Sequence, residues 1–111
     1  MNRLIESTII TGTDVSSEVS FTRNNERLEV SSLILEGAYT NTAFTLQAKY
    51  GTTWYDVYDA FGVKVSITVA SGKHTLPFDS FKDVTAVRVK GASNEASDRI
   101  VKFVLADYIN D

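Results

Sequence analysis

The stretch that decides the fold reads Val63-Lys64-Val65-Ser66-Ile67-Thr68-Val69. Apolar and polar residues alternate through all seven positions, so an extended chain places the four apolar side chains on one face and the three polar ones on the other. This period of two is typical of a β-strand that buries one face. We therefore expect a strand whose inward residues are Val63, Val65, Ile67 and Val69.

The same pattern continues on the N-terminal side of this strand. Residues 44–50 alternate in the same way, and Gly51 follows them at once. Residues 54–58 then resume a composition that favours strands, and a second turn is expected at 59–62. The inward residues of the first of these strands are expected to be Phe44, Leu46 and Ala48. The three strands between residues 44 and 69 are predicted to follow one another as a β-meander.

Shorter alternating segments are spread over the rest of the chain. Further strands are expected at residues 4–11, 17–22, 28–35, 84–90 and 100–109. The last of these carries apolar residues on both faces, which indicates a strand that is central or covered on both sides. About eight strands, spaced by roughly 8 to 12 residues, predict an all-β fold. We expect a single antiparallel β-sandwich, jelly-roll-like, that spans the whole chain from 1 to 111.

Helical signal is confined to one short segment, and the connections are polar. Residues 76–83 include Asp79, which predicts a single capped helical turn. The segments 22–27 and 91–98 are rich in Asn, Ser and Glu and are expected to be exposed loops. The six glycines are scattered singly, which is consistent with one glycine per turn.

Composition excludes several classes of protein. The 111 residues are 43% hydrophobic and 23% charged, which is typical of one folded domain and untypical of a disordered chain. Because there is no cysteine and only one histidine, disulfide frameworks, thiolate metal sites and multi-histidine zinc sites are excluded. The formal net charge of −3 argues against a nucleic-acid partner, which proteins bind with basic surfaces.

Few residues offer catalytic chemistry. His74 lies in a segment that is expected to be a turn before a strand, and there is no G-x-S-x-G motif. Two pairs of aspartates, Asp56 with Asp59 and Asp79 with Asp83, have spacings that match no calcium loop. We therefore predict a protein that is not an enzyme and that has no catalytic residues, no metal site and no cofactor.

The N-terminal segment 1–11 alternates imperfectly, with isoleucines on both faces. It contains no apolar run long enough for a signal peptide or a membrane span, so we expect synthesis in the cytoplasm and no membrane partner. The pattern favours an arm or edge strand that pairs with a neighbouring molecule through Ile5 and Ile9. Removal of residues 2–8 is expected to abolish assembly and to leave the fold intact.

The aromatic residues between positions 50 and 58 form the one group with a functional pattern. In a regular strand Trp54 and Tyr58 share one face, whereas Tyr55 shares the other with Val57, so one pair is expected at the surface. Exposed Trp and Tyr rings form hot spots for protein partners or stack on sugar rings. We predict partner binding through Trp54, Tyr55 and Tyr58, and the alternative is that the single tryptophan belongs to the core.

The order of these elements resembles a family of small β-sandwich proteins encoded in the structural-gene clusters of tailed bacteriophages and prophages. Its members carry the hairpin motif G-T-T-W/F-Y-D-L/V-Y-D-x-x-G, which residues 51–62 match. An alternating strand, a D-P-x-x-F turn and a V-R-L/V strand follow. The last two correspond here to residues 77–81, where the proline precedes the aspartate, and 87–89. The resemblance spans roughly residues 9 to 105 and also includes 14–19.

The resemblance implies a structural protein of the virion and carries over no catalytic or binding residues. We expect a non-enzymatic capsid decoration protein on the outer shell, made in the host cytoplasm. Its expected partners are the major capsid protein or other virion proteins and further copies of itself as a homo-oligomer. A tail or fibre accessory protein and a carbohydrate-binding module are the alternatives, so a glycan stays open as a partner. The carbohydrate-binding alternative requires an exposed Trp54 or Tyr58.

Overall fold

The computed structural model describes residues 2–20, 28–59, 61–70, 72–75 and 85–107. Within these ranges the chain forms nine strands and no helix. The described residues therefore contain no helix that could cross a membrane. The strands are β1 (Asn2–Ile9), β2 (Val19–Ser20), β3 (Leu28–Leu35), β4 (Ala43–Tyr50), β5 (Thr53–Asp56), β6 (Ser66–Thr68), β7 (Gly72–Thr75), β8 (Ala86–Gly91) and β9 (Arg99–Asp107).

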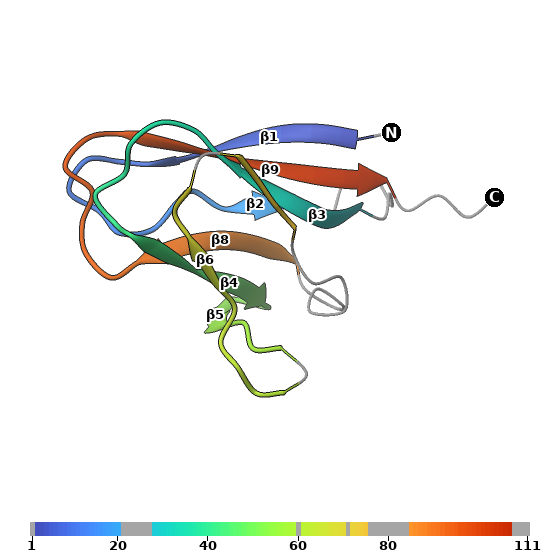
Figure 1. Cartoon of the computed structure of the whole chain (residues 1–111). Helices are drawn as coiled ribbons and strands as arrows, with labels where there is room; N and C mark the ends of the chain where they lie inside the picture. Colours follow the sequence, from blue (N-terminus) through green and yellow to red (C-terminus); the bar gives the residue numbers. More distant parts are fainter. Residues whose placement is uncertain (1, 21–27, 60, 71, 76–84, 108–111) are drawn as a thin grey trace.

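Two antiparallel sheets make up the molecule (Figure 1). The four-stranded sheet A has the order β1-β9-β3-β7. The five-stranded sheet B has the order β2-β8-β4, and β5 and β6 both pair with the remaining side of β4. The predicted all-β sandwich is confirmed. The expected central position of the last strand is confirmed as well, because β9 lies between β1 and β3.

The strands pair from the two ends of the chain inwards. β1 pairs with β9, β2 with β8, β3 with β7, and β4 with β5 and β6. Along the chain, these pairs fall alternately in sheet A and sheet B. A long antiparallel hairpin that is rolled up around a core has this connectivity, which is that of a jelly roll. The predicted jelly-roll character is therefore confirmed.

The core lies between the two sheets and follows the predicted alternation. In β4 the side chains of Phe44, Leu46 and Ala48 are buried, as are those of Val87 and Val89 in β8. Sheet A contributes Ile9, Leu33, Leu35, Val101, Phe103 and Leu105 to the same cluster. Burial of these large apolar side chains from both sheets is what holds the sheets face to face.

The predicted meander is wrong. β5 pairs with the second half of β4 and β6 with the first half, so the two strands lie end to end along one side of β4. Between them the chain leaves the sheet over residues 58–64, where Tyr58 and Lys64 form a bridge, whereas Val57 and Val65 still bond the backbone of Leu46 in β4. Val63 lies in this excursion and is 60% exposed, in contrast to its predicted place in the core. The other apolar residues of the stretch, Val65, Ile67 and Val69, pack against the core.

Strand β7 replaces the turn that was expected around His74. It pairs with residues 32–35 of β3, and His74 lies opposite Leu33. The expected turn is wrong because only pairing with a distant strand makes this short polar segment extended. The helical turn predicted at 76–83 and the loop predicted at 22–27 lie outside the described residues.

A buried carboxylate joins the loops at one end of the sandwich. Glu95, in the β8–β9 loop, accepts hydrogen bonds from the backbone N–H groups of Thr40 (2.7 Å) and Asn41 (3.0 Å). It also accepts them from Asn41 Nδ2 (2.6 Å) and Arg99 Nε (3.0 Å). Backbone hydrogen bonds connect Glu95 to the β1–β2 loop as well. The prediction that 91–98 is simply an exposed loop is therefore wrong at Glu95, which is 1% exposed.

The charge of Glu95 is set by these partners. Burial alone would raise its pKa, but the hydrogen bonds from Thr40, Asn41 and Arg99 together outweigh burial and lower the pKa to about 2. The side chain is thus ionised at neutral pH although solvent does not reach it. A buried charge of this kind is stable only while its partners stay in place, so it fixes the β8–β9 loop to the β3–β4 loop, and the backbone of Glu95 adds the β1–β2 loop.

Gly91 has a different role from the predicted one. It is buried at the end of β8 beside Asn41, and a methyl group added at this position would overlap the Asn41 side chain. Asn41 in turn bonds the backbone of Ser93 through both ends of its amide, at 2.8 Å and 3.0 Å. Gly91 therefore provides room for the loop network, whereas the other five glycines have positive φ angles, four of them in connections between strands and Gly72 at the start of β7.

Candidate functional site

The chain projects from sheet B between β5 and β6 (Figure 1). The turn is closed around Asp59, whose Oδ1 accepts hydrogen bonds from the backbone N–H groups of Phe61 (2.8 Å) and Val63 (3.0 Å). Backbone bonds from Asp59 N to Val63 O (2.8 Å) and from Gly62 N to Asp59 O (3.0 Å) close it further. Gly62 supplies a φ of 78°, which side chains disfavour. These contacts give the described residues of 58–64, here called the projecting loop, a defined shape.

The projecting loop holds three apolar side chains in solvent. Tyr58 is 53% exposed, Val63 60% and Phe61 92%. A phenyl ring exposed to this extent adds almost nothing to the core, and aromatic side chains are enriched at protein interfaces. The sequence prediction included Tyr58 but placed Phe61 only in a turn. The signal that points to Phe61 is an aromatic residue inside a turn of otherwise small and polar residues.

Trp54 lies neither in the core nor open to solvent. It is half-buried in β5 opposite Lys49, whose Nζ is 5.7 Å from the centroid of the tryptophan ring. The guanidinium carbon of Arg88 lies closer, at 4.2 Å from the ring centroid. Such contacts are worth roughly 0.5 to 2 kcal/mol each. The interpretation of Trp54 as a core residue is wrong, because the ring lies outside the core beside the guanidinium of Arg88, whereas its contact with a partner stays a prediction.

Tyr55 and Tyr58 are both exposed, although they were expected on opposite faces of the strand. Each of the two predicted pairs therefore has one exposed member and one that is buried or half-buried. Tyr55 is 54% exposed and lies beside Tyr50, with ring centroids 6.1 Å apart, whereas Val57 is buried. Tyr58 lies under Lys64, whose Nζ is 5.9 Å from the ring centroid. The regular alternation fails because β5 ends at Asp56, two residues before the projecting loop begins at Tyr58.

The predicted N-terminal contact residues lie in β1, an edge strand of sheet A that pairs with β9 along its whole length. Ile5 is partly buried against the core. Ile9 is fully buried, so it offers no surface to a partner and this part of the prediction is wrong. Since Ser7 is buried as well, residues 2–8 are a structural part of the sandwich and not a separable arm.

A groove of about 390 Å³ lies on the outer face of sheet B, over β4. A chain of polar side chains leads into it. Arg88 Nε donates to Gln47 Oε1 (2.8 Å), Gln47 Nε2 donates to Asp56 Oδ1 (3.0 Å), and Lys64 Nζ lies 3.2 Å from Asp56 Oδ2. The hydrogen bonds from Gln47 and Lys64 lower the pKa of Asp56. The sequence prediction missed this set because only the register of β4, β5 and β8 brings the residues together.

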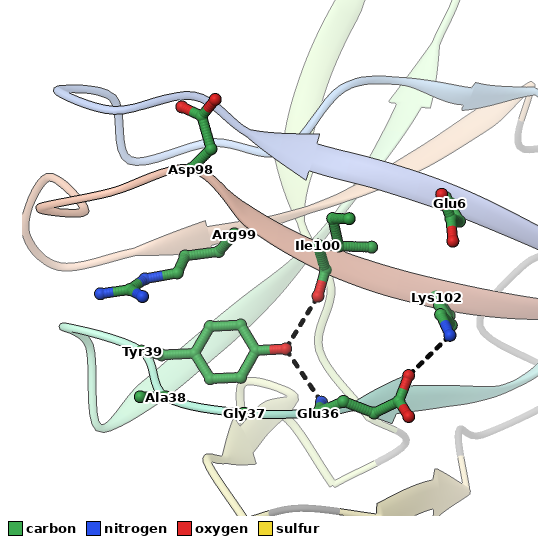
Figure 2. Close-up of a pocket in the computed structure, with 9 residues that line it drawn as sticks. All are labelled: Glu6, Glu36, Gly37, Ala38, Tyr39, Asp98, Arg99, Ile100 and Lys102. Atoms are coloured by element: carbon green, nitrogen blue, oxygen red, sulfur yellow. Dashed lines mark hydrogen bonds and ion pairs between the residues drawn. The ribbon is translucent and has the colours of Figure 1, made fainter.

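A second hollow, also of about 390 Å³, lies over sheet A beside the β3–β4 loop (Figure 2). Tyr39 Oη donates to Ile100 O (2.8 Å) and accepts a hydrogen bond from Glu36 N (3.1 Å). Lys102 Nζ pairs with Glu36 Oε1 at 2.6 Å. Burial raises the pKa of Tyr39, which keeps its hydroxyl protonated as a donor. Because these groups are committed to one another, they brace the β3–β4 loop against β9.

The residues considered for catalysis are dispersed. In β7, His74 Nε2 lies 2.9 Å from Ala70 O, while Asp59 closes the projecting loop and Asp56 belongs to the groove. Asp79 and Asp83 lie outside the described residues. The ranges that the structure describes contain no group of three His, Cys, Asp or Glu side chains that could hold a metal ion. The features that the described residues do build are surfaces, the projecting loop and the groove.

Comparison with known proteins identifies the fold. No protein-family model and no curated protein matches the chain. Among solved structures, the SPBc2 prophage-derived protein YomS is similar, with a TM-score of 0.51 and 12% sequence identity, over 95% of this chain and 94% of YomS. A candidate alpha-L-fucosidase from Bacteroides thetaiotaomicron matches with a TM-score of 0.46 and 15% identity, over 94% of this chain but only 22% of that protein. The chain therefore shares its fold with a prophage-derived protein of nearly the same extent.

Proposed function

We propose that the protein is a non-enzymatic structural component of a tailed-phage particle, a decoration protein that attaches to the outer shell. The sequence resemblance to small phage β-sandwich proteins supports this proposal. So does the fold shared with YomS, which is prophage-derived. The observation that carries it is the projecting loop, which holds Phe61 92% exposed on a braced turn.

The loop has the properties of a contact with a protein partner. Its turn is fixed by Asp59 before binding, so little conformational entropy is lost when a partner orders it. Tyr58 and Val63 flank Phe61 and widen the apolar surface around the ring. An apolar pocket on a shell subunit would bury this ring as a hot spot. Several copies attached to a symmetric shell also give the expected self-association a simple geometric basis.

The test uses particles from the phage or prophage that encodes the chain, purified by density gradient. The wild-type protein is expected in the particle band, and Phe61→Ser is expected to reduce its incorporation by about tenfold or more, because a buried aromatic hot spot contributes 2 kcal/mol or more. Ile10→Ser is the matched control, since Ile10 is also exposed (60%) but lies in another loop. Its incorporation should stay within about twofold of the wild type.

Immunogold labelling of the particles then locates the protein. Label over the head supports a decoration protein. Label confined to the tail or fibres rejects the shell in favour of an accessory protein, and absence from purified particles rejects the virion proposal altogether. Equal incorporation of the Phe61 variant would show that the loop is not the contact.

A further inference from the structure

The groove of sheet B differs from the hollow of sheet A in having polar groups that are not committed to other residues. Thr45, Ser66 and Lys90 line it, and their side chains make no hydrogen bond or ion pair with any residue in the described part of the chain. The polar groups over sheet A are, in contrast, largely engaged with one another. Two hydroxyls and an ammonium group along one groove are therefore free to meet a ligand.

The charges on this face are unlike those of the whole chain. The net charge of the whole chain is −3, yet among the described residues four cations lie on or beside the outer face of sheet B. Lys49 is paired with Glu18 at 2.9 Å and Lys64 with Asp56 at 3.2 Å. The other two, Arg88 and Lys90, form no ion pair with a described carboxylate, although Asp14 and Glu18 lie close enough to interact with the charge of Arg88, and Asp56 with that of Lys90. They lie two positions apart on β8 and so share its outer face, about 7 Å apart along the strand.

Arg88 is held in one orientation. Its Nε donates to Gln47 at 2.8 Å, and its guanidinium lies on the ring of Trp54. These two contacts use one N–H group and one face of the guanidinium, and the two terminal nitrogens stay available. A guanidinium fixed in this way is suited to bind a carboxylate through two parallel hydrogen bonds. Burial lowers the pKa of Arg88, which still keeps it protonated at neutral pH.

We propose that this groove binds an acidic polysaccharide, with sugar carboxylates on Lys90 in its lining and on Arg88, which borders the groove through its hydrogen bond to Gln47, and with sugar hydroxyls on Thr45 and Ser66. A hydroxyl-rich ligand fits a lining of hydroxyl, amide and ammonium groups better than an apolar protein surface does. The volume of about 390 Å³ lies within the usual range of small-ligand sites. The groove shares Lys64 with the projecting loop but not the exposed side chains of Tyr58, Phe61 and Val63, so the inference does not rest on the proposed function.

The test measures binding of a uronic-acid trisaccharide to the purified full chain by titration calorimetry, with its carboxyl-reduced form as the comparison. The acidic sugar is expected to bind at least about tenfold more tightly than the reduced one, because hydrogen bonds to a charged group are roughly twice as strong. Lys90→Gln and Arg88→Gln should each weaken binding by about tenfold. Emission of Trp54, the only tryptophan, should change on titration because it contacts Arg88.

Lys49→Gln is the matched control. Lys49 lies on the same face but does not line the groove, and its ammonium pairs with Glu18, whereas Arg88 bonds the lining residue Gln47. The affinity of Lys49→Gln should therefore stay within about twofold of the wild type. Equal loss with Lys49→Gln, equal binding of the reduced sugar, or equally tight binding of polyglutamate would each overturn the proposal in favour of non-specific charge attraction. Absence of any binding at millimolar sugar would overturn it as well. If Arg88→Gln fails to fold, Lys90→Gln with Ser66→Ala decides the question.

Discussion

At the scale of single residues, the buried carboxylate of Glu95 depends on the hydrogen bonds that it accepts for its charge. The pKa of its carboxyl is about 2 in the folded chain and near its ordinary value of 4.5 in the unfolded chain. As pH falls, the unfolded chain takes up the proton first, so the contribution is complete above about pH 4.5 and is lost between there and pH 2. The contribution amounts to about 3 kcal/mol.

Glu95→Gln tests this contribution. The variant should be destabilised by roughly 2 to 4 kcal/mol at pH 7, because the amide cannot replace the charged acceptor of Thr40, Asn41 and Arg99. Urea unfolding at several pH values measures the difference, which should shrink as pH falls from 4.5 to 2. A difference that stays constant over that range would show that the carboxyl is not held ionised.

The residues next to Glu95 in the sequence did not indicate that its carboxylate is buried. A glutamate in a loop rich in Ser and Asn has the composition of solvent-exposed chain. Its partners Thr40 and Asn41 lie 55 and 54 positions away, so only the folded topology places them around it. The same reason applies to Arg88 and Gln47, which are 41 positions apart.

At the scale of elements, the projecting loop depends on one side chain. Asp59→Ala should remove the acceptor of the Phe61 and Val63 amides and speed their hydrogen exchange by roughly tenfold, while the free energy of unfolding falls by only about 1 kcal/mol. Asp59→Asn keeps an oxygen at the same position and should preserve most of the protection. Unchanged exchange in Asp59→Ala would mean that the backbone bonds alone hold the loop.

Strands were predictable where alternation coincides with burial on one side. Leu28 to Leu35 was located to the residue, and the predicted inward residues of β4 are buried, although Gln47 on the opposite face of β4 is buried as well. The prediction of strands failed where pairing with a distant strand, and not local composition, decides whether a segment is extended. The four residues of β7 have no apolar alternation, and Val63 continues an alternation that the chain abandons at the projecting loop.

At the scale of the whole molecule, alternation predicted a sandwich because each strand needs an opposing apolar face. The order of strands within the sheets follows from pairings that span most of the sequence, such as Asn2 with Ala106. Pairings at such separations leave no periodic trace in the sequence. The candidate surfaces share this limit, since the groove needs three strands in register, whereas the exposed tyrosines lie on one segment and were predicted.

Removal of residues 2–8 therefore acts on the whole molecule. It would expose the outer edge of β9 and uncover the buried surface around Phe103 and Leu105, which the paired strand helps to shield. We expect the truncated chain to lose its cooperative thermal transition, measured by circular dichroism, whereas Leu4→Ser in the full chain should keep it because Leu4 is 53% exposed. If the truncated chain melted like the wild type, β1 would contribute nothing to closure of the jelly roll. That result would support the original prediction that residues 2–8 form a separable arm.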